Sequence, residues 1–213
     1  DPPVSMTQRM LPTWLTLAAI AVATVLGVYH LTHGLRAVTS DQARQRSLAA
    51  APRALPSIPL VDSHGQRREL SQIANEHPYT VVTLVYTQCT SLCLLTASSE
   101  AYLQSRLRDA GLQKQVGLVT ISFDPARDTP EELALYARRV KADAGTWTIA
   151  TVADPSDLDV LLDAFGVVVL ADGAGGYTHN GALFLIDRRG RLFDALDPDA
   201  ADRVFDRLVA LVP

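Results

Sequence analysis

Cys89 and Cys93 are the residues best suited to chemistry in this sequence of 213 residues, and they are its only cysteines. Two cysteines are too few to act as the disulfide staples of a small fold. A bridge across this Cys-x-x-x-Cys spacing closes a very small loop, which constrains the unfolded chain little. We therefore expect the pair to react or to bind a ligand. The alternative is that they are two core cysteines that happen to be neighbours.

The place of the pair in the chain indicates which chemistry it can do. Residues 80–86 are β-branched and almost all apolar, as in a buried strand, and a helical pattern runs from about residue 92 to Ala110. Backbone N–H groups at a helix N-terminus favour anions and so stabilise thiolates. Two thiolates on one face of the first turn could share a Cu(I) ion, although zinc also accepts such ligands and a disulfide is possible.

The elements that must position the cysteines alternate between strands and helices. Besides the strand before Cys89, we expect strands at 116–122, 147–152, 167–170, 182–186 and 192–195. Besides the helix after Cys93, we expect helices at 130–142, 155–165 and 198–211. Crossovers between parallel strands, followed by an antiparallel pair, indicate an α/β fold with a mixed central sheet and helices on both faces. This three-layer arrangement is the layout of a thioredoxin-like domain.

His179 is a candidate third ligand. In such a topology its loop, just before the predicted strand at 182–186, returns beside the cysteine turn, where a neutral imidazole would complete a site of two sulfurs and one nitrogen. Taken alone, a loop histidine is more often a surface residue. The remaining histidines are better explained as structural or solvated, namely His30, His33, His64 and His77.

Charged residues gather before the predicted helix at 130–142. The segment 129–132 has the composition of a helix N-terminal capping box. Asp124, Arg127 and Asp128 could support the site, but helix capping and loop hydrogen bonds explain them more simply. The glycine-rich segment 171–176 precedes no helix, so it lacks the N-terminus that would hold a phosphate.

An apolar segment near the N-terminus predicts one membrane-spanning helix. Residues 10–35 carry no formal charge, and Leu15–Tyr29 are almost entirely apolar. The residues after this segment are not small, which favours a retained anchor over a cleaved signal peptide. The arginines that follow would, taken alone, place the C-terminal side in the cytoplasm. We expect a tail at 1–10, an anchor at 11–35, a tether at 36–57 and a folded domain at 58–213.

Composition excludes a largely disordered protein and gives no support for a nucleic-acid-binding protein. A hydrophobic content of 48% is ample for a core, which excludes disorder for most of the chain. The net charge of −4 gives no case for nucleic-acid binding, which depends on basic patches.

Three motifs together resemble the Sco/SenC family of membrane-anchored, thioredoxin-like copper proteins of cytochrome c oxidase assembly. They are CTSLC at 89–93, ISFDPARDTPEEL at 121–133 and THNGALFLID at 178–187. The resemblance covers the domain and the anchor. It implies one copper ion per chain, as Cu(I) or Cu(II), held by Cys89, Cys93 and His179.

The resemblance also implies a role and a location. The protein would deliver copper to the copper-accepting subunit of a respiratory oxidase or to another copper protein, or would reduce that partner's cysteines. The location implied is the bacterial inner membrane, with a single span and the C-terminal domain in the periplasm. Two departures matter. Thr90 and Leu94 stand where the family usually has prolines, and Thr178 stands where it usually has Asp.

Three functions therefore remain open. The first is a non-enzymatic copper metallochaperone. The second is a thiol-disulfide oxidoreductase with Cys89 and Cys93 as its redox pair. The third is a peroxiredoxin-like peroxidase, suggested by Thr87, although the usual Pro-x-x-x-Thr-x-x-Cys environment is absent.

Overall fold

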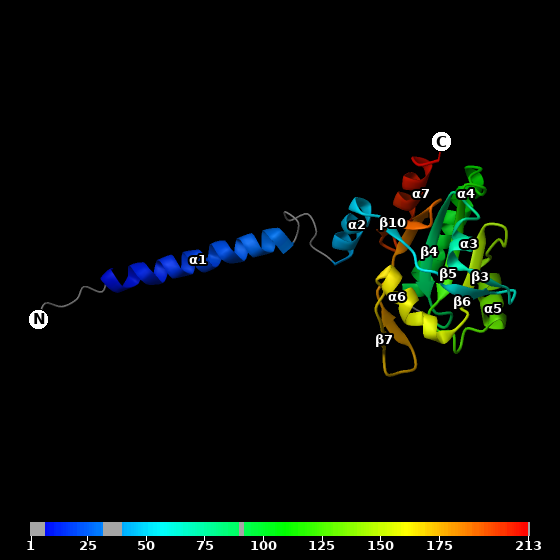
Figure 1. Ribbon diagram of the computed structural model, residues 1–213, viewed down its shortest axis with the longest axis horizontal. Helices are drawn as coiled ribbons and strands as arrows, with labels where there is room; N and C mark the ends of the chain where they lie inside the picture. Colours follow the sequence, from blue (N-terminus) through cyan, green and yellow to red (C-terminus); the bar gives the residue numbers. More distant parts are fainter. Residues whose placement is uncertain (1–6, 32–39, 90–91, 213) are drawn as a thin grey trace, which may run out of the picture. The chain divides into compact units, whose positions relative to one another are not determined.

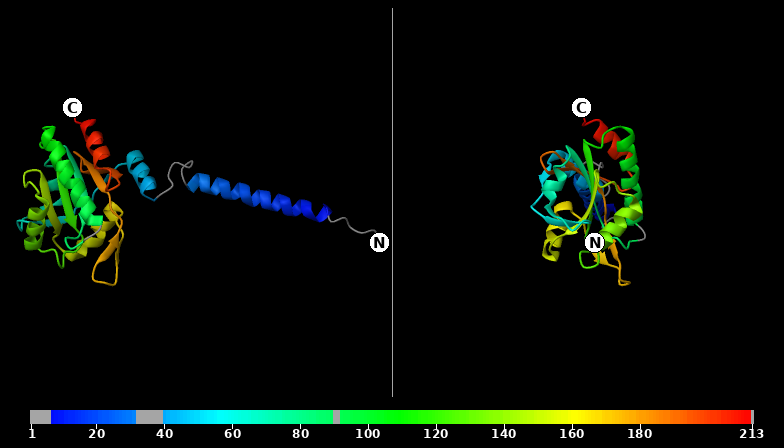
Figure 2. Two further views of the ribbon diagram at one scale, coloured as in Figure 1. Left: turned by 180° about the vertical axis from the view of Figure 1, so that it is seen from behind. Right: turned by 90° about the vertical axis from the view of Figure 1, so that its right-hand side faces the viewer.

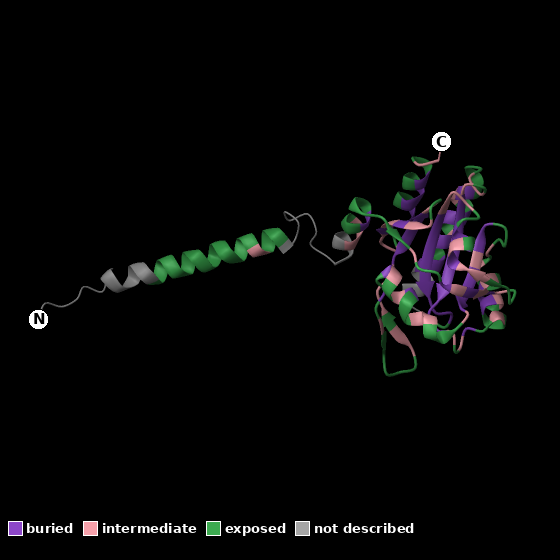
Figure 3. Ribbon diagram, in the orientation of Figure 1, coloured by how far each residue is buried: buried purple, intermediate pink, exposed green. Residues whose placement is uncertain are grey.

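The computed structural model describes residues 7–31, 40–89 and 92–212, without the side chains of 7–12, 31, 40–43 and 92–95. The chain divides into two compact units, residues 1–44 and 45–213. The first unit contains the helix α1 (Thr7–Leu31). Its segment Thr13–His30 has a mean hydropathy of 1.5 and is long enough to cross a membrane. The described side chains of α1 are almost all exposed (Figure 3), which confirms the predicted apolar N-terminal helix as a candidate span.

The second unit is built on an eight-stranded mixed sheet in the order β1-β10-β9-β4-β5-β6-β2-β3 (Figure 1). Its centre is the parallel set β4 (Tyr79–Val85), β5 (Val116–Ser122) and β6 (Trp147–Val152). The antiparallel strands on either side are β9 (Leu183–Asp187), β10 (Arg191–Leu196), β1 (Arg53–Ala54), β2 (Pro59–Asp62) and β3 (Arg67–Glu69). The predicted mixed central sheet is confirmed.

Helices cover both faces of this sheet (Figures 1 and 2). One hydrophobic cluster joins the sheet to α3 (Leu70–Ala74), α6 (Leu158–Phe165) and Leu48 of α2 (Ser40–Ala50). The other joins it to α4 (Leu92–Asp109), α5 (Pro130–Val140) and α7 (Ala201–Val209). A short 3₁₀ turn, η1 (Pro155–Asp157), leads into α6.

The strand β5 shows how the sequence produces these layers. All of its residues are buried, and successive side chains of a strand point to opposite faces. Leu118 belongs to the cluster under α4, α5 and α7, whereas Val119 and Ile121 belong to the cluster on the other face. A strand that is buried on both faces therefore serves both cores, and this is why its side chains do not alternate between buried apolar and exposed polar residues.

The segment expected to be a tether contains ordered elements. Leu48 of α2 is only 1% exposed, and β1 pairs with β10. The pairing of Arg53 and Ala54 and the burial of Leu48 depend on tertiary contacts, which the composition of a polar, alanine-rich segment does not predict. The hairpin β2–β3 and the helix α3 were not predicted either, because their short elements have no clear periodicity.

The topology brings three connections to one edge of the sheet. The parallel strands β4 and β5 both end there, at Val85 and Ser122. The strand β9 runs antiparallel to β4, with Val82 opposite Phe184, so the chain enters β9 at the edge where β4 leaves. The loops that follow β4 and β5 and the segment that precedes β9 therefore meet at this edge.

Candidate metal centre

The cysteine turn follows directly from β4. The backbone N–H of Cys89 donates to the carbonyl of Tyr86 at 3.2 Å, which closes the turn. Cys89 is half-buried and packs against the core cluster that includes Tyr86. Cys93 lies in the first turn of α4, as expected, but its side chain is outside the described residues, as are Thr90 and the side chain of Leu94.

Asp128 holds this turn from the neighbouring β5 connection. Its carboxylate accepts a 2.9 Å hydrogen bond from the backbone N–H of Thr87 and a 2.6 Å bond from the Thr87 hydroxyl. The hydroxyl of Ser122 donates to the same carboxylate, which is fully buried. Arg139 of α5 donates to the Thr87 carbonyl at 2.8 Å. Thr87 is thus bound through its N–H, carbonyl and hydroxyl groups two residues before Cys89.

His179 lies at the end of a short strand rather than in a loop. The strands β7 (Val169–Ala171) and β8 (Tyr177–His179) form an antiparallel pair that places Val169 opposite His179. The Asn180 side chain accepts from the N–H of Val168 at 2.7 Å and donates to the carbonyl of Gly166 at 3.1 Å. These bonds fix the chain immediately after His179.

The environment of His179 suits a neutral metal ligand. Burial lowers its pKa from the usual 6.5, and a hydrogen bond to the Asn180 backbone opposes this shift. The ring Nδ1 lies 2.9 Å from the Asn180 carbonyl oxygen, which can only accept, so Nδ1 carries the proton. The Nε2 lone pair is then the donor that the ring can offer to a metal ion.

Tyr86 contacts both the cysteine turn and the histidine strand. Its carbonyl accepts from Cys89, while its hydroxyl accepts from the Tyr177 N–H at 3.3 Å. Its ring centroid lies 5.2 Å from that of Tyr177 and 6.4 Å from that of His179. Phe123, just after β5, places its ring 4.9 Å from the imidazole. The structure therefore brings Cys89 and His179 to the same residue, as the topology predicted.

Arg127 ties the β5 connection to the histidine hairpin. Its guanidinium forms an ion pair with Asp124 and donates to the carbonyl of Gly175 at 2.6 Å. The same group lies over the ring of Tyr177, 5.2 Å from its centroid. The charged segment, for which the sequence left open capping or support of the site, both caps α5 and contacts the cysteine turn and the histidine hairpin. Capping by Thr129 is confirmed, since its side chain accepts from the Glu132 N–H at 3.5 Å.

The aromatic residues around His179 were missed by the sequence analysis. Tyr86 comes directly after β4, Phe123 comes directly after β5, and Tyr177 is the first residue of β8. The sequence could have indicated them, because each connection that this topology brings to one edge of the sheet contains an aromatic residue. The glycine-rich segment is the β7–β8 turn, where Asp172 accepts from the N–H groups of Ala174 and Gly176.

The other histidines lie elsewhere. His64 is exposed after β2, His77 packs against Gly117, His30 is exposed in α1, and His33 is outside the described residues. Among the residues that the structure describes, no group of three or more His, Cys, Asp and Glu side chains could hold a metal ion. That set does not include the Cys93 side chain.

Comparisons with known proteins point to one family. The sequence pattern of the SCO1/SenC family matches residues 49–211. A "putative copper-binding protein" of Stutzerimonas stutzeri is 28% identical over 165 residues, which cover 74% of this chain and 78% of that protein.

Two solved structures show the same fold. Yeast Sco1 with copper bound has a TM-score of 0.60 and 17% identity, over 76% of this chain and 92% of that chain. BsSco, a member of the Sco family of cytochrome c oxidase assembly proteins in which a disulfide switch was identified, has a TM-score of 0.65 and 16% identity, over 75% and 94% of the two chains. With the match over most of its length, this chain belongs to the SCO1/SenC family, the thioredoxin-like Sco proteins of cytochrome oxidase assembly.

Proposed function

We propose that this protein binds one copper ion through Cys89, Cys93 and His179 and delivers it to the copper-accepting subunit of a respiratory oxidase or to another copper protein. The observation that carries the proposal is the neutral, half-buried His179, whose Nδ1 is engaged by Asn180 and whose ring contacts the residue that closes the cysteine turn. Two thiolates with one imidazole form a soft donor set that suits Cu(I) and also accepts Cu(II).

The residues around the ligands support transfer by ligand exchange. Asp128 and Tyr86 fix the start of the cysteine turn, while Asn180 fixes the histidine. Ligands held at a constant distance lose little conformational entropy when the ion arrives. Cys89 and His179 are both half-buried rather than enclosed, so an incoming ligand of the partner can replace them one at a time.

Metal analysis tests this proposal. The reduced protein is offered copper and zinc together, and we expect about one copper and little zinc per chain. His179→Ala should lower copper affinity at least about tenfold, because even the loss of a group that hydrogen-bonds to a metal ligand commonly costs about 10–100-fold. His64→Ala is the matched control, because His64 is exposed outside the site. A preference for zinc, or full affinity in His179→Ala, contradicts the ligand set.

A second function is reduction of a partner's disulfide by the same dithiol. Its support is the position of Cys93 in the first turn of α4, where a thiolate is stabilised, and the disulfide switch found in BsSco. The copper-free, reduced protein should then reduce a partner disulfide in a reaction that Cys93→Ser stops at a mixed disulfide. Reduction that continues to completion in Cys93→Ser argues against this pair as the redox centre.

We also propose a retained anchor, predicted at residues 11–35 and including most of α1 (Thr7–Leu31), in the bacterial inner membrane with the domain in the periplasm. The support is the long, apolar and exposed surface of α1. A C-terminal fusion to alkaline phosphatase, which needs the periplasm to fold, should be active and remain in the membrane fraction. An inactive fusion contradicts the orientation, and a released active fusion contradicts retention.

A further inference from the structure

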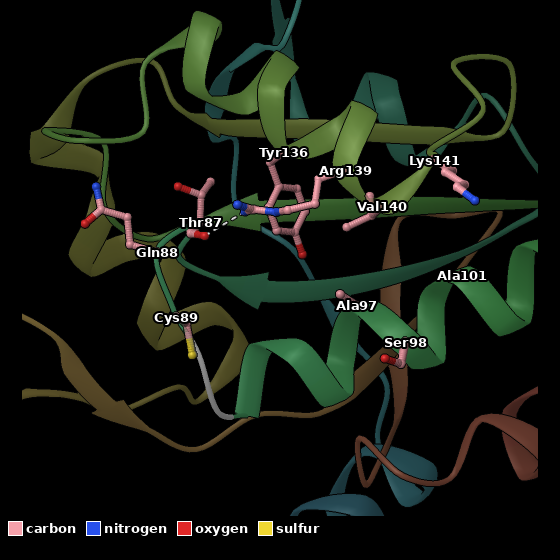
Figure 4. Close-up of a pocket in the computed structure, with 10 residues that line it drawn as sticks. All are labelled: Thr87, Gln88, Cys89, Ala97, Ser98, Ala101, Tyr136, Arg139, Val140 and Lys141. Atoms are coloured by element: carbon pink, nitrogen blue, oxygen red, sulfur yellow. Dashed lines mark hydrogen bonds between the residues drawn. The ribbon is translucent and has the colours of Figure 1, made fainter.

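A groove between α4 and α5 reaches the cysteine turn at one end. Its volume is about 490 Å³, which lies in the range of small-molecule sites. Figure 4 shows Cys89 at one end and Lys141 at the other, with the two helices along the sides. The described lining residues are Thr87, Gln88, Cys89, Ala97, Ser98, Ala101, Tyr136, Arg139, Val140 and Lys141. His179 is not among them, so the groove lies apart from the histidine side of Cys89.

The sides of the groove are mostly apolar. Ala97 and Ala101 are one helical turn apart on α4, and Tyr136 and Val140 are one turn apart on α5. The small side chains of the two alanines leave the space that the groove occupies. A ligand with a short hydrocarbon stem would remove apolar surface from water here.

The charges of the groove are all positive. Its described lining includes Arg139 and Lys141 but no Asp or Glu. The Arg139 guanidinium is held by the Thr87 carbonyl and lies 5.1 Å from the ring centroid of Tyr136. Lys141 is exposed at the end of α5, and neither cation forms an ion pair within the described parts of the chain. Lys141 therefore favours an anionic group at the end of the groove remote from Cys89, and Arg139 adds positive charge nearer the cysteine turn.

We propose that this groove binds a small disulfide of net negative charge, with its carboxylate at Lys141, its stem against Ala97 and Ala101, and its sulfur at Cys89. The proposal rests on the redox function of the dithiol and names its small-molecule substrate class. The Cys89 thiolate attacks one sulfur of the disulfide, a new S–S bond forms to Cys89, and the original S–S bond breaks. The departing half leaves as a thiolate and takes up the proton that the Cys89 thiol released.

The test compares disulfides that differ in charge. The reduced full-length protein, in a non-ionic detergent, reacts separately with glutathione disulfide (anionic), bis(2-hydroxyethyl) disulfide (neutral) and cystamine (cationic). The Cys93→Ser background traps the Cys89 adduct for mass spectrometry. We expect glutathione disulfide to react faster than cystamine. Lys141→Glu should slow glutathione disulfide by about tenfold and speed cystamine, because the attraction is electrostatic.

Two further variants test whether the changes in rate come from the groove or from a general change in the charge of the protein. Lys114→Glu makes the same charge change at the other lysine of the sequence, which is exposed before β5 and outside the groove, and it should leave all three rates unchanged. Ala101→Leu fills the groove without changing charge and should slow glutathione disulfide more than the small neutral disulfide.

Three outcomes would overturn the proposal. A ratio of the glutathione disulfide rate to the cystamine rate that is the same in the parent protein, Lys141→Glu and Lys114→Glu shows that the groove does not select an anion. Effects of Lys141→Glu confined to reaction with a protein disulfide would assign the groove to a protein segment instead. Failure of all three disulfides to react rejects the groove as a site for a small disulfide. Reduction of a partner's disulfide and copper stoichiometry, measured on the same proteins, judge the two proposed functions separately.

Discussion

Asp128 binds Thr87 through both carboxylate oxygens, one accepting from the backbone N–H and the other from the hydroxyl. The two residues belong to connections that follow neighbouring parallel strands, so this contact fixes one connection against the other. The cysteine turn therefore begins from a point that is held by a buried carboxylate. The position of Cys89 depends on a residue far away in the sequence that does not itself need to touch the metal.

Asp128→Asn should weaken this attachment. An amide has only one oxygen, so one of the two bonds from Thr87 or the bond from Ser122 is lost or reversed. We expect the free energy of unfolding to fall by about 1–3 kcal/mol and copper affinity to fall with it. Urea unfolding and a competitive copper titration measure the two effects. Asp143→Asn, at an exposed position, is the control, and equal behaviour of the two variants contradicts this role of Asp128.

Arg127→Lys should loosen the histidine hairpin while keeping the charge beside Asp124. A lysine cannot pair with Asp124, donate to the Gly175 carbonyl and lie flat over the Tyr177 ring at once, because its ammonium is compact. We expect faster copper dissociation with unchanged stoichiometry, measured by transfer to a chelator. Copper should dissociate from the control variant Arg188→Lys, in the β9–β10 turn, at the same rate as from the parent protein. An unchanged rate in Arg127→Lys means that the hairpin does not need this contact.

The sequence predicted the strands and helices that position the site better than the side-chain contacts within it. The strand at 116–122 and the helix start at Thr129 lie where predicted, because a continuous buried strand and a capped helix are local patterns. The meeting of the cysteine turn with His179 followed from the order of the elements. The first inference uses local sequence patterns, and the second uses the order of strands and helices along the chain.

The aromatic contacts around His179 could not be predicted in this way. Tyr86, Phe123 and Tyr177 come from three connections, and each residue alone is an ordinary loop or strand aromatic. The strand β8 also cannot be predicted from its own residues, because Tyr177–His179 form a strand only by pairing with β7. Burial of Leu48 in the core has the same origin. These features depend on tertiary contacts, which a single sequence does not encode as a period or a motif.

Glu100 makes stability depend on pH in the opposite sense to an ordinary paired carboxylate. It is fully buried in α4, where it accepts from the hydroxyls of Thr83 at 2.8 Å and Thr120 at 2.9 Å. Burial raises its pKa from 4.5 to about 8, and the two hydroxyl bonds only partly oppose the shift. Between these values the folded protein binds the proton and the unfolded chain does not, so stability falls as pH rises through this range.

The slope should reach at most about 1.4 kcal/mol per pH unit and should vanish above the folded pKa. Urea unfolding from pH 5 to pH 9 measures it. Glu100→Gln has no ionisable group, so its stability should lack this component and exceed that of the parent protein most clearly at high pH. Parallel pH profiles for the two proteins contradict a neutral Glu100.

Phe123 should set the protonation of His179 through contact with its ring. The phenyl group is 3% exposed and lies 4.9 Å from the imidazole, so it supplies part of the burial that lowers the pKa of His179. Phe123→Ala admits water, and we expect the His179 pKa to rise toward 6.5 while the free energy of unfolding falls by about 3–5 kcal/mol. Phe123→Leu keeps most of the apolar contact and should shift the pKa less. An NMR titration of the imidazole in the copper-free protein measures each pKa. Because protons compete with copper for Nε2, copper binding by Phe123→Ala should weaken at a higher pH than in the parent protein, and an unchanged midpoint means that other neighbours provide the burial.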